Sequence, residues 1–363
     1  MKYSKEELLL VWLDSFSGLN PKLKAELYEK ATKETAIKDF LIKNRDSIIR
    51  EADENVFNTL VSSANDAYLK FMLNGYERKG IKAITLQSKS YPQSLKNLPF
   101  PPVVIYAKGN EKLLTGKLFS IVGARKSLPL SISIAKSFAK ALVGAGYTLV
   151  TGIAEGVDSA VIEETINNNG KVISVLAGGH DNIYPATHSS LVDKISETGL
   201  VISEYPPEVK AMPYFFPIRN RIIAGLSRGT LVVSAGKKSG TMHTARYAEE
   251  FGKDLFAVPY NVGVASGAGC NELIKMGAML TDTPDDILSF YGEERKEKIN
   301  LTPNEKEICI LLLDGEKHIE YICEKLGKQI YEISPIISIL EIKGVLSKTG
   351  SNVYGLMNTD LED

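Results

Sequence analysis

The chain has 363 residues, which is too long for one typical domain and predicts two or three. Hydrophobic residues make up 44% of it and charged residues 24%, as in an ordinary globular protein, and no apolar run is long enough to span a membrane. The formal net charge of −1 excludes binding to a polyanion by bulk attraction, so a nucleic-acid site would have to come from local patterning.

The cysteines and the N-terminus indicate an intracellular setting. Cys270, Cys309 and Cys323 are odd in number and have no CxxC spacing, so neither a disulfide framework nor a zinc site is predicted. The first apolar stretch is interrupted by Asp14 and has no small-residue cleavage site, so we expect no signal peptide. A cytoplasmic location is the expectation that follows.

Residues 1–75 predict a small helical domain. Apolar residues recur at helical spacing in 8–13, in 23–28 and in 57–61, and a turn at 18–21 separates two of these stretches. Residues 76–117 are expected to be a connector that packs on the next domain. Because prolines crowd this connector, the sequence predicts an extended segment and excludes a helix there.

Residues 118–290 alternate short β-rich runs with amphipathic stretches of helical length. The expected strands are 119–122, 148–151, 172–176, 200–203, 230–234 and 254–258. The expected helices are 131–144, 158–168, 187–198, 241–251 and 271–276. The strands lack polar–apolar alternation, as strands do when both faces of a parallel sheet are covered. The pattern predicts an α/β domain with a doubly wound, Rossmann-like sheet.

The remainder predicts a charged linker at 291–300 and a further domain at 301–363. Residues 302–305 match a capping box with proline at the first helical position. Helices are expected at 303–313, 319–326 and 331–343, followed by a small hairpin, and this order predicts a winged helix. Its third helix has two glutamates and one lysine, so protein contact or duplex sensing is expected rather than base readout.

A window of forty residues between Glu208 and Glu249 contains no carboxylate. Its basic residues are Lys210, Arg219, Arg221, Arg228, Lys237, Lys238 and Arg246, and its aromatic residues are Tyr214, Phe215, Phe216 and Tyr247. Cations interleaved with aromatic rings are typical of a surface that binds single-stranded nucleic acid. The alternative is that the rings belong to the core and the cations are ordinary surface charges.

Glycine-bearing turns follow four of the expected strands. They are Gly123-Ala124-Arg125, residues 152–156, Gly178-Gly179, and Gly236 with Ser239-Gly240-Thr241. In a doubly wound sheet these turns lie at the carboxyl edge, where backbone N–H groups can bind phosphate, although each could also be simple turn chemistry.

No enzyme signature accompanies these turns. GxGxxG and Walker A sequences are absent, and the G-x-S-x-G match at 225–229 precedes a strand rather than a helix. The four histidines lack metal-ligand spacing, and Asp158 is expected to be an N-cap or a first-turn residue of a helix. We therefore predict no catalytic residue, no metal and no cofactor.

Several segments together carry a family resemblance. In chain order they are 123–127, 151–158, 175–185, 203–206, 216–227, 239–241 and 256–259, and the strongest is the run from Phe216 to Ser227. With these segments, residues 119–279 resemble the DprA/Smf family of bacterial DNA-processing proteins. The flanking parts fit its longer members, which have a SAM-like helical domain and a winged helix.

The resemblance implies a homodimer without catalysis that binds single-stranded DNA, protects it during natural transformation and loads the recombinase RecA. By position, Arg125 would bind a phosphate, Arg219 and Arg221 would bind the backbone, and Phe216 would stack on a base. Backbone N–H groups would come from Gly152, Gly179 and the turn Ser239-Gly240-Thr241. The rest of the expected DNA-binding set is Gly123, Lys210, Asn220 and Lys237.

Four positions depart from the family pattern. The family usually has arginine at Glu155, histidine at Val161, glutamate at Ser234 and lysine at Pro213. Glu155 would place a negative charge on the expected phosphate rim, unless its side chain points away or pairs with Arg125.

Two other functions stay open. One is a nucleotide-processing enzyme resembling the lysine-decarboxylase-like phosphoribohydrolases, which needs a carboxylate beside a glycine-rich turn. After Ser239-Gly240-Thr241 the nearest downstream acids are Glu249 and Glu250. The other is a nucleotide-sensing scaffold protein whose rim binds a small ligand.

Overall fold

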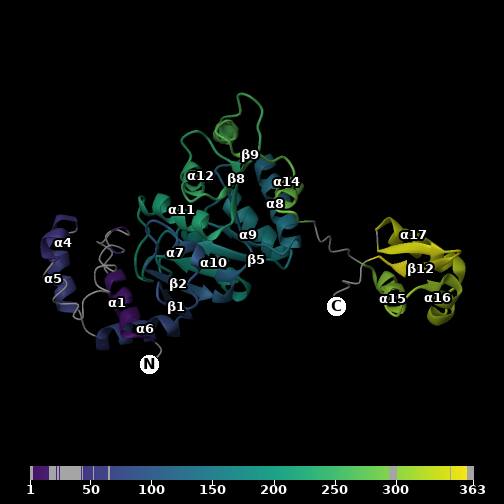
Figure 1. The fold of residues 1–363 in the computed structure, drawn as a ribbon, viewed down its shortest axis with the longest axis horizontal. Helices are drawn as coiled ribbons and strands as arrows, with labels where there is room; N and C mark the ends of the chain where they lie inside the picture. The colour runs from purple at the N-terminus through teal and green to yellow at the C-terminus, as the bar shows by residue number, and fades with distance from the viewer. Residues whose placement is uncertain are drawn as a thin grey trace. The chain divides into compact units, whose positions relative to one another are not determined.

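The computed structural model describes residues 3–15, 22, 24, 42, 44–51, 53–63, 66–293, 301–343 and 345–357 (Figure 1). The chain forms two compact units, Met1–Arg295 and Lys296–Asp363, called the first and second unit below. The finer boundaries predicted from the sequence remain a proposal. In the part of the chain that is described, no helix has both the length and the hydropathy of a membrane span.

The first unit is built on a nine-stranded sheet in the order β1-β2-β6-β5-β4-β3-β7-β8-β9. The strands are β1 (Ile81–Thr85), β2 (Val104–Gly109), β3 (Leu118–Gly123), β4 (Thr148–Thr151), β5 (Lys171–Val175), β6 (Leu200–Ser203), β7 (Gly229–Ser234), β8 (Asp254–Ala257) and β9 (Met279–Leu280). All pairs from β6 to β9 are parallel, and the chain order reverses between β3 and β7. The predicted doubly wound α/β sheet is confirmed.

Helices cover both faces of this sheet. They are α8 (Pro129–Gly144), α9 (Val157–Asn167), α10 (Ser189–Thr198), α11 (Phe215–Leu226), α12 (Thr241–Glu250), α13 (Ala268–Lys275) and α14 (Pro284–Phe290). Successive residues of β3 show how the sequence fills two cores, because side chains alternate between the faces of a strand. Ile121 packs in the cluster that contains residues of α8, α9 and α14, whereas Val122 packs in the one with residues of α11, α12 and α13.

The connector departs from its expected form. It contributes β1 and β2 as an antiparallel pair that extends the sheet beyond β6. The prediction that its prolines exclude a helix is wrong, because Gln93–Lys96 form the short helix α7. Pro92 is its N-cap, a position at which proline leaves no helical hydrogen bond unmade, and the next prolines come after the helix has ended.

Described helices before the sheet are α1 (Lys5–Asp14), α4 (Arg45–Glu51), α5 (Glu54–Ser63) and α6 (Asp66–Arg78). Residues of α1, including the buried Trp12, share a core with α6 and with Tyr106 of β2. Most of the predicted helical stretch 23–28 lies outside the described residues, and the SAM-like assignment remains a prediction.

The second unit contains α15 (Pro303–Leu311), α16 (Ile319–Leu326) and α17 (Ile330–Ile342), with β10 (Lys317–His318), β11 (Leu346–Gly350) and β12 (Val353–Leu356). The predicted capping box is present, since Thr302 and Glu305 each accept a hydrogen bond from the other's backbone N–H. The exposed face of α17 carries Tyr331, Ile339 and Ile342. The three predicted helices and the hairpin are confirmed, while the name winged helix remains a proposal.

Candidate nucleic-acid interface

A groove of about 700 Å³ lies at the carboxyl ends of β3 and β7, where the strand order reverses. This is the position at which doubly wound sheets bind ligands. Its lining comes mainly from the turn after β3, the first turns of α11 and the turn before α12, with further residues such as Ala154, Asp158 and Tyr184. Of the predicted site residues, the groove brings together Gly123, Arg125, Phe216, Arg219, Asn220, Ser239, Gly240 and Thr241.

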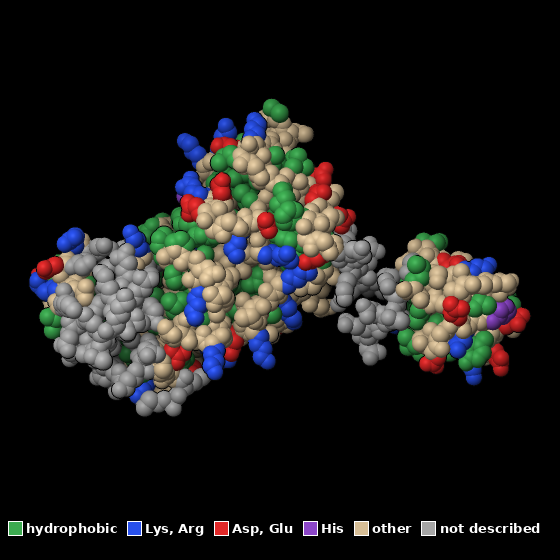
Figure 2. Space-filling view, viewed as in Figure 1, with side chains coloured by type: hydrophobic (Ala, Val, Ile, Leu, Met, Phe, Trp, Pro, Cys, Tyr) green, Lys and Arg blue, Asp and Glu red, His purple; other side chains and the backbone are tan. Residues whose placement is uncertain are grey.

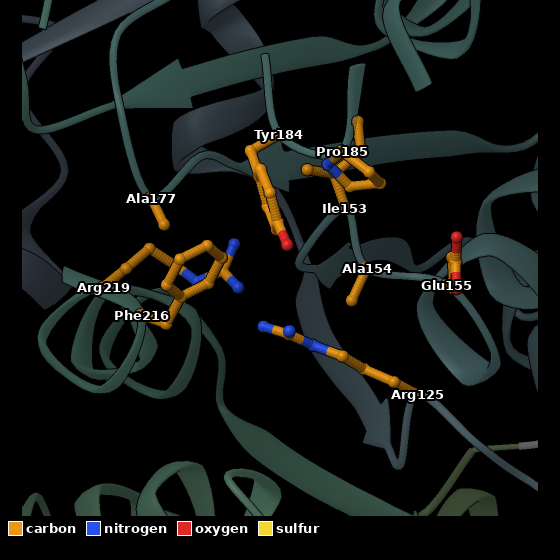
Figure 3. Close-up of a pocket in the computed structure, with 9 residues that line it drawn as sticks. All are labelled: Arg125, Ile153, Ala154, Glu155, Ala177, Tyr184, Pro185, Phe216 and Arg219. Atoms are coloured by element: carbon orange, nitrogen blue, oxygen red, sulfur yellow. The ribbon is translucent and has the colours of Figure 1, made fainter. Parts of the chain in front are cut away.

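A smaller pocket of about 100 Å³ shares Arg125, Tyr184, Phe216 and Arg219 with the groove (Figure 3). The two guanidinium groups point into the same space, and Tyr184 points its hydroxyl toward it. The Arg125 guanidinium lies 5.0 Å from the centre of the Phe216 ring, and the Tyr184 ring meets that ring edge-on at 5.6 Å. Two cations and two aromatic rings therefore surround one space.

Arg219 is 6% exposed and is held by fixed partners. It donates hydrogen bonds to the Val175 carbonyl and to Asn220 Oδ1 (3.1 Å), and it lies beside the buried carboxylate of Asp158. Burial lowers the pKa of Arg219 to about 10, and Asp158 opposes this change. The guanidinium therefore stays charged at neutral pH and supplies a pre-positioned cation.

Asp158 lies in the first turn of α9, as predicted, and accepts a hydrogen bond from the Ala154 N–H (3.2 Å). Burial raises its pKa, while the charge of Arg219 lowers it. A Cβ at Gly152 would overlap both the Asp158 carboxylate and the Arg219 guanidinium. Glycine at 152 thus makes room for this pair.

The turn after β3 is fixed by two serines. Ser127 Oγ donates to the Ala124 carbonyl (2.7 Å), and Ser234 Oγ accepts from the Ala124 N–H (3.2 Å). The two hydroxyls are 2.9 Å apart, so they link the turn to the end of β7. Arg125 is exposed at the tip of this anchored turn.

The turn before α12 presents the N-terminus of a helix, where the partial positive charge favours anions. Gly240 is the N-cap, and its Cα faces open space. The Asn220 side-chain amide donates to the Gly240 carbonyl (3.3 Å) and holds the turn against α11. Lys237 and Lys238 beside it are exposed, and Figure 2 shows lysine and arginine side chains around α12.

Two predicted DNA contacts do not fit the structure, and a third, Gly152, is buried and does not line the groove. Arg221 is 1% exposed and forms an ion pair with Glu204, because it lies two residues after Arg219 and so faces the opposite side of α11. Gly179 is buried, and its N–H donates to the Val209 carbonyl (2.7 Å). Neither reaches the groove. Lys210 is exposed but does not line the groove, although its neighbour Ala211 does.

The structure shows where the four residues that differ from the family pattern lie. Glu155 is exposed and lines the smaller pocket, apart from the two guanidinium groups (Figure 3). Val161 is in the core, Ser234 anchors the turn after β3, and Pro213 lines the groove. The charge of Glu155 therefore does not sit between Arg125 and Arg219.

Sequence reasoning missed Tyr184 and the role of Asp158 as the counter-ion of Arg219. Tyr184-Pro185 follows the third glycine turn, Gly178-Gly179. Its closeness in the sequence to a turn at the carboxyl edge of the sheet was the signal that could have identified Tyr184 as a site residue. Among the described residues that line the groove, Asp158 is the only carboxylate, and it lies beside Arg219.

Protonation of His180 should destabilise the first unit in acid. His180 Nε2–H donates to the Tyr106 carbonyl (2.9 Å), and burial lowers the pKa of this imidazole to about 4. The unfolded chain, with a histidine pKa near 6.5, binds the proton first, so stability should fall as the pH drops from about 6.5 toward 4. Urea unfolding of the wild type and His180→Gln at several pH values tests this, and equal losses in both proteins would contradict it.

Comparison with known proteins shows where the chain belongs. Residues 82–292 match the family described as DNA recombination-mediator protein A. The chain is 37% identical over 223 residues to DNA processing protein DprA of Bacillus subtilis, which covers 61% of this chain and 75% of that protein.

Two solved structures are also similar. DprA of Streptococcus pneumoniae matches with a TM-score of 0.68 and 29% identity over 80% of this chain and 98% of that one. DprA of Helicobacter pylori, solved to describe its single-stranded DNA binding mode, matches with a TM-score of 0.53 and 29% identity over 58% of this chain and 95% of that one. The family match covers more than half of the chain, including every segment of the groove. The chain is thus a member of the DNA recombination-mediator protein A family, which contains the DprA proteins.

Proposed function

We propose that this protein binds single-stranded DNA in the groove at the carboxyl edge of its sheet. The observation that carries the proposal is the convergence of Arg125, Arg219, Phe216 and Tyr184 on one pocket. Guanidinium groups bind phosphate, and aromatic rings stack on any unpaired base, so the pair of features suits a single strand. A duplex keeps its bases stacked inside and could not use the rings.

The strand would run from this pocket along the groove. One phosphate would lie between Arg125 and Arg219, and the base next to it would stack against Phe216 and Tyr184. A neighbouring phosphate would meet the N–H groups at Gly240 and Thr241, with Lys237 and Lys238 nearby. Such contacts read the backbone and the face of a base, so binding should depend weakly on sequence.

The relatives support a role in DNA recombination. The family description names a recombination mediator, and the H. pylori relative binds single-stranded DNA. We infer that this protein acts in the cytoplasm as a homodimer without catalysis, protects incoming single strands during natural transformation and loads a RecA-type recombinase onto them.

Fluorescence anisotropy with labelled oligo-dT over a series of salt concentrations tests the binding. We expect tight binding that duplex DNA of equal length does not compete away. Two phosphate contacts give a slope of log K against log salt of about −1.4 for a single strand. The slope distinguishes phosphate binding from hydrophobic association, which salt does not weaken.

Absence of binding at low salt would contradict the proposal. AMP and free nucleobase should then be screened by thermal melting and by product analysis. Release of adenine from AMP would support a phosphoribohydrolase, and a melting shift without turnover would support a nucleotide sensor.

A further inference from the structure

The end of α6 contacts the loop between β6 and α11 and, at one point, the loop between β5 and α10. Lys79 Nζ lies 2.6 Å from Asp181 Oδ2 in the loop between β5 and α10. The Tyr76 hydroxyl donates to the carboxylate of Glu208, 3.1 Å from each oxygen. Asn182 closes the arrangement, because its side-chain amide donates to the Glu208 carbonyl (2.8 Å).

The end of α6 is a firm base for these contacts. Tyr76 is 7% exposed and belongs to the core shared by α1, α6 and β2. Its ring packs edge-on against Tyr106 at 5.7 Å, and the carbonyl of Tyr106 accepts from His180 of the loop between β5 and α10. A packed aromatic ring moves little, so whatever its hydroxyl holds is held in a fixed position.

The held loop carries Tyr184 into the proposed DNA site. Tyr184 comes three residues after Asp181 and two after Asn182, lines both the groove and the smaller pocket, and packs against Phe216. Its side chain is 56% exposed, so contacts of its own ring do not fix it fully. The side-chain contacts of Asp181 and Asn182 therefore contribute to the position of the ring.

We propose that Tyr76 and Lys79 are positioning residues for DNA binding and act through Tyr184. The inference rests on the proposed function, but it adds a part of the chain that lies before the matched family region. Neither residue lines the groove, so neither is expected to contact the strand.

The chain offers a matched control for this proposal. Lys82 lies three residues after Lys79 and pairs with Glu111 at 2.7 Å, and the two lysine side chains are similarly exposed, at 49% and 52%. Exposed ion pairs of this kind contribute little to folding stability. Loss of either pair should thus leave the fold intact, and only loss of the Lys79 pair should release the Tyr184 loop.

The test compares Tyr76→Phe/Lys79→Met with Lys82→Met in oligo-dT anisotropy. We expect the double variant to bind about tenfold more weakly, with an unchanged salt slope because no phosphate contact is lost. Lys82→Met should bind as the wild type does. In a Tyr184→Ala background the double variant should cause no further loss, because its effect passes through that ring. Hydrogen exchange at 179–185 should be faster in the double variant alone.

The inference would be overturned by an equal loss in the Tyr184→Ala background, by an equal loss in Lys82→Met, or by unchanged exchange at 179–185. If the wild type fails to bind oligo-dT, the proposed function falls and the DNA role of Tyr76 and Lys79 falls with it. Wild-type binding that the double variant retains in full rejects this inference alone.

Discussion

Replacement of Arg221 by methionine should lower the free energy of unfolding by about 3–5 kcal/mol, as loss of one partner of a buried ion pair does. Arg221 and Glu204 are 1% and 5% exposed, and their side chains pair inside the first unit. Without the guanidinium, the Glu204 carboxylate stays buried with no compensating charge. Urea unfolding at pH 7, followed by circular dichroism, measures the change.

Two controls separate this effect from a general loss of charge. Lys108→Met removes the pair with Asp193 (3.0 Å), in which the two side chains are 30% and 66% exposed, and should cost about 1 kcal/mol or less. Glu204→Gln combined with Arg221→Met removes the buried charge and should restore part of the stability.

The DNA affinity of Arg221→Met gives the sharper distinction. Because Arg221 does not reach the groove, the folded variant should bind oligo-dT within about twofold of the wild type. If the variant is as stable as the wild type but fails to bind DNA, Arg221 must belong to the DNA-binding surface after all.

The sheet and its rim were predictable because short-range rules fix them. Strands such as 148–151 are buried on both faces, so their sequences show no polar–apolar alternation. The glycine turns after those strands must then lie at one edge, because parallel strands end on the same side of a sheet. The placement of Arg125 and Ser239-Gly240-Thr241 together followed from these two rules.

The different fates of Arg219 and Arg221 could not be predicted in the same way. Both lie in the acid-free window, yet Arg219 faces the pocket and Arg221 faces the core. The sequence did not reveal α11, because Pro217 lies in its first turn, where proline is tolerated but obscures the helical pattern. Their partners, Asp158 and Glu204, lie in other elements. Only the tertiary structure therefore shows which arginine is buried in an ion pair and does not reach the groove.

The contribution of the N-terminal part to the site was hidden for a related reason. Tyr76 and Lys79 read as ordinary residues at the end of a helix, and their partners are more than one hundred residues further along the chain. Hydrogen bonds over such separations leave no periodic trace in a sequence. Local patterns identify the rim, whereas long-range contacts decide the position of its side chains.

Replacement of Phe216 by alanine should weaken binding to oligo-dT by about 1–3 kcal/mol, which is the contribution of one stacked base. Phe216 lines the pocket with Arg125 on one side and the edge of Tyr184 on another, and an unpaired base would lie against the exposed part of its ring. The loss should be similar for different sequences, since every base has a face to stack. The salt slope should not change, because no cation is removed.

Two further variants make this result specific. Arg125→Ala should reduce the salt slope by about 0.7, the share of one phosphate contact in a single strand, whereas Phe216→Ala should leave it unchanged. Tyr214→Ala removes an aromatic side chain from the same acid-free window that is 59% exposed and does not line the groove, so it should bind normally. Equal losses in Tyr214→Ala and Phe216→Ala would mean that the aromatic residues support α11 rather than stack on bases, and the strand would then be held by its phosphates alone.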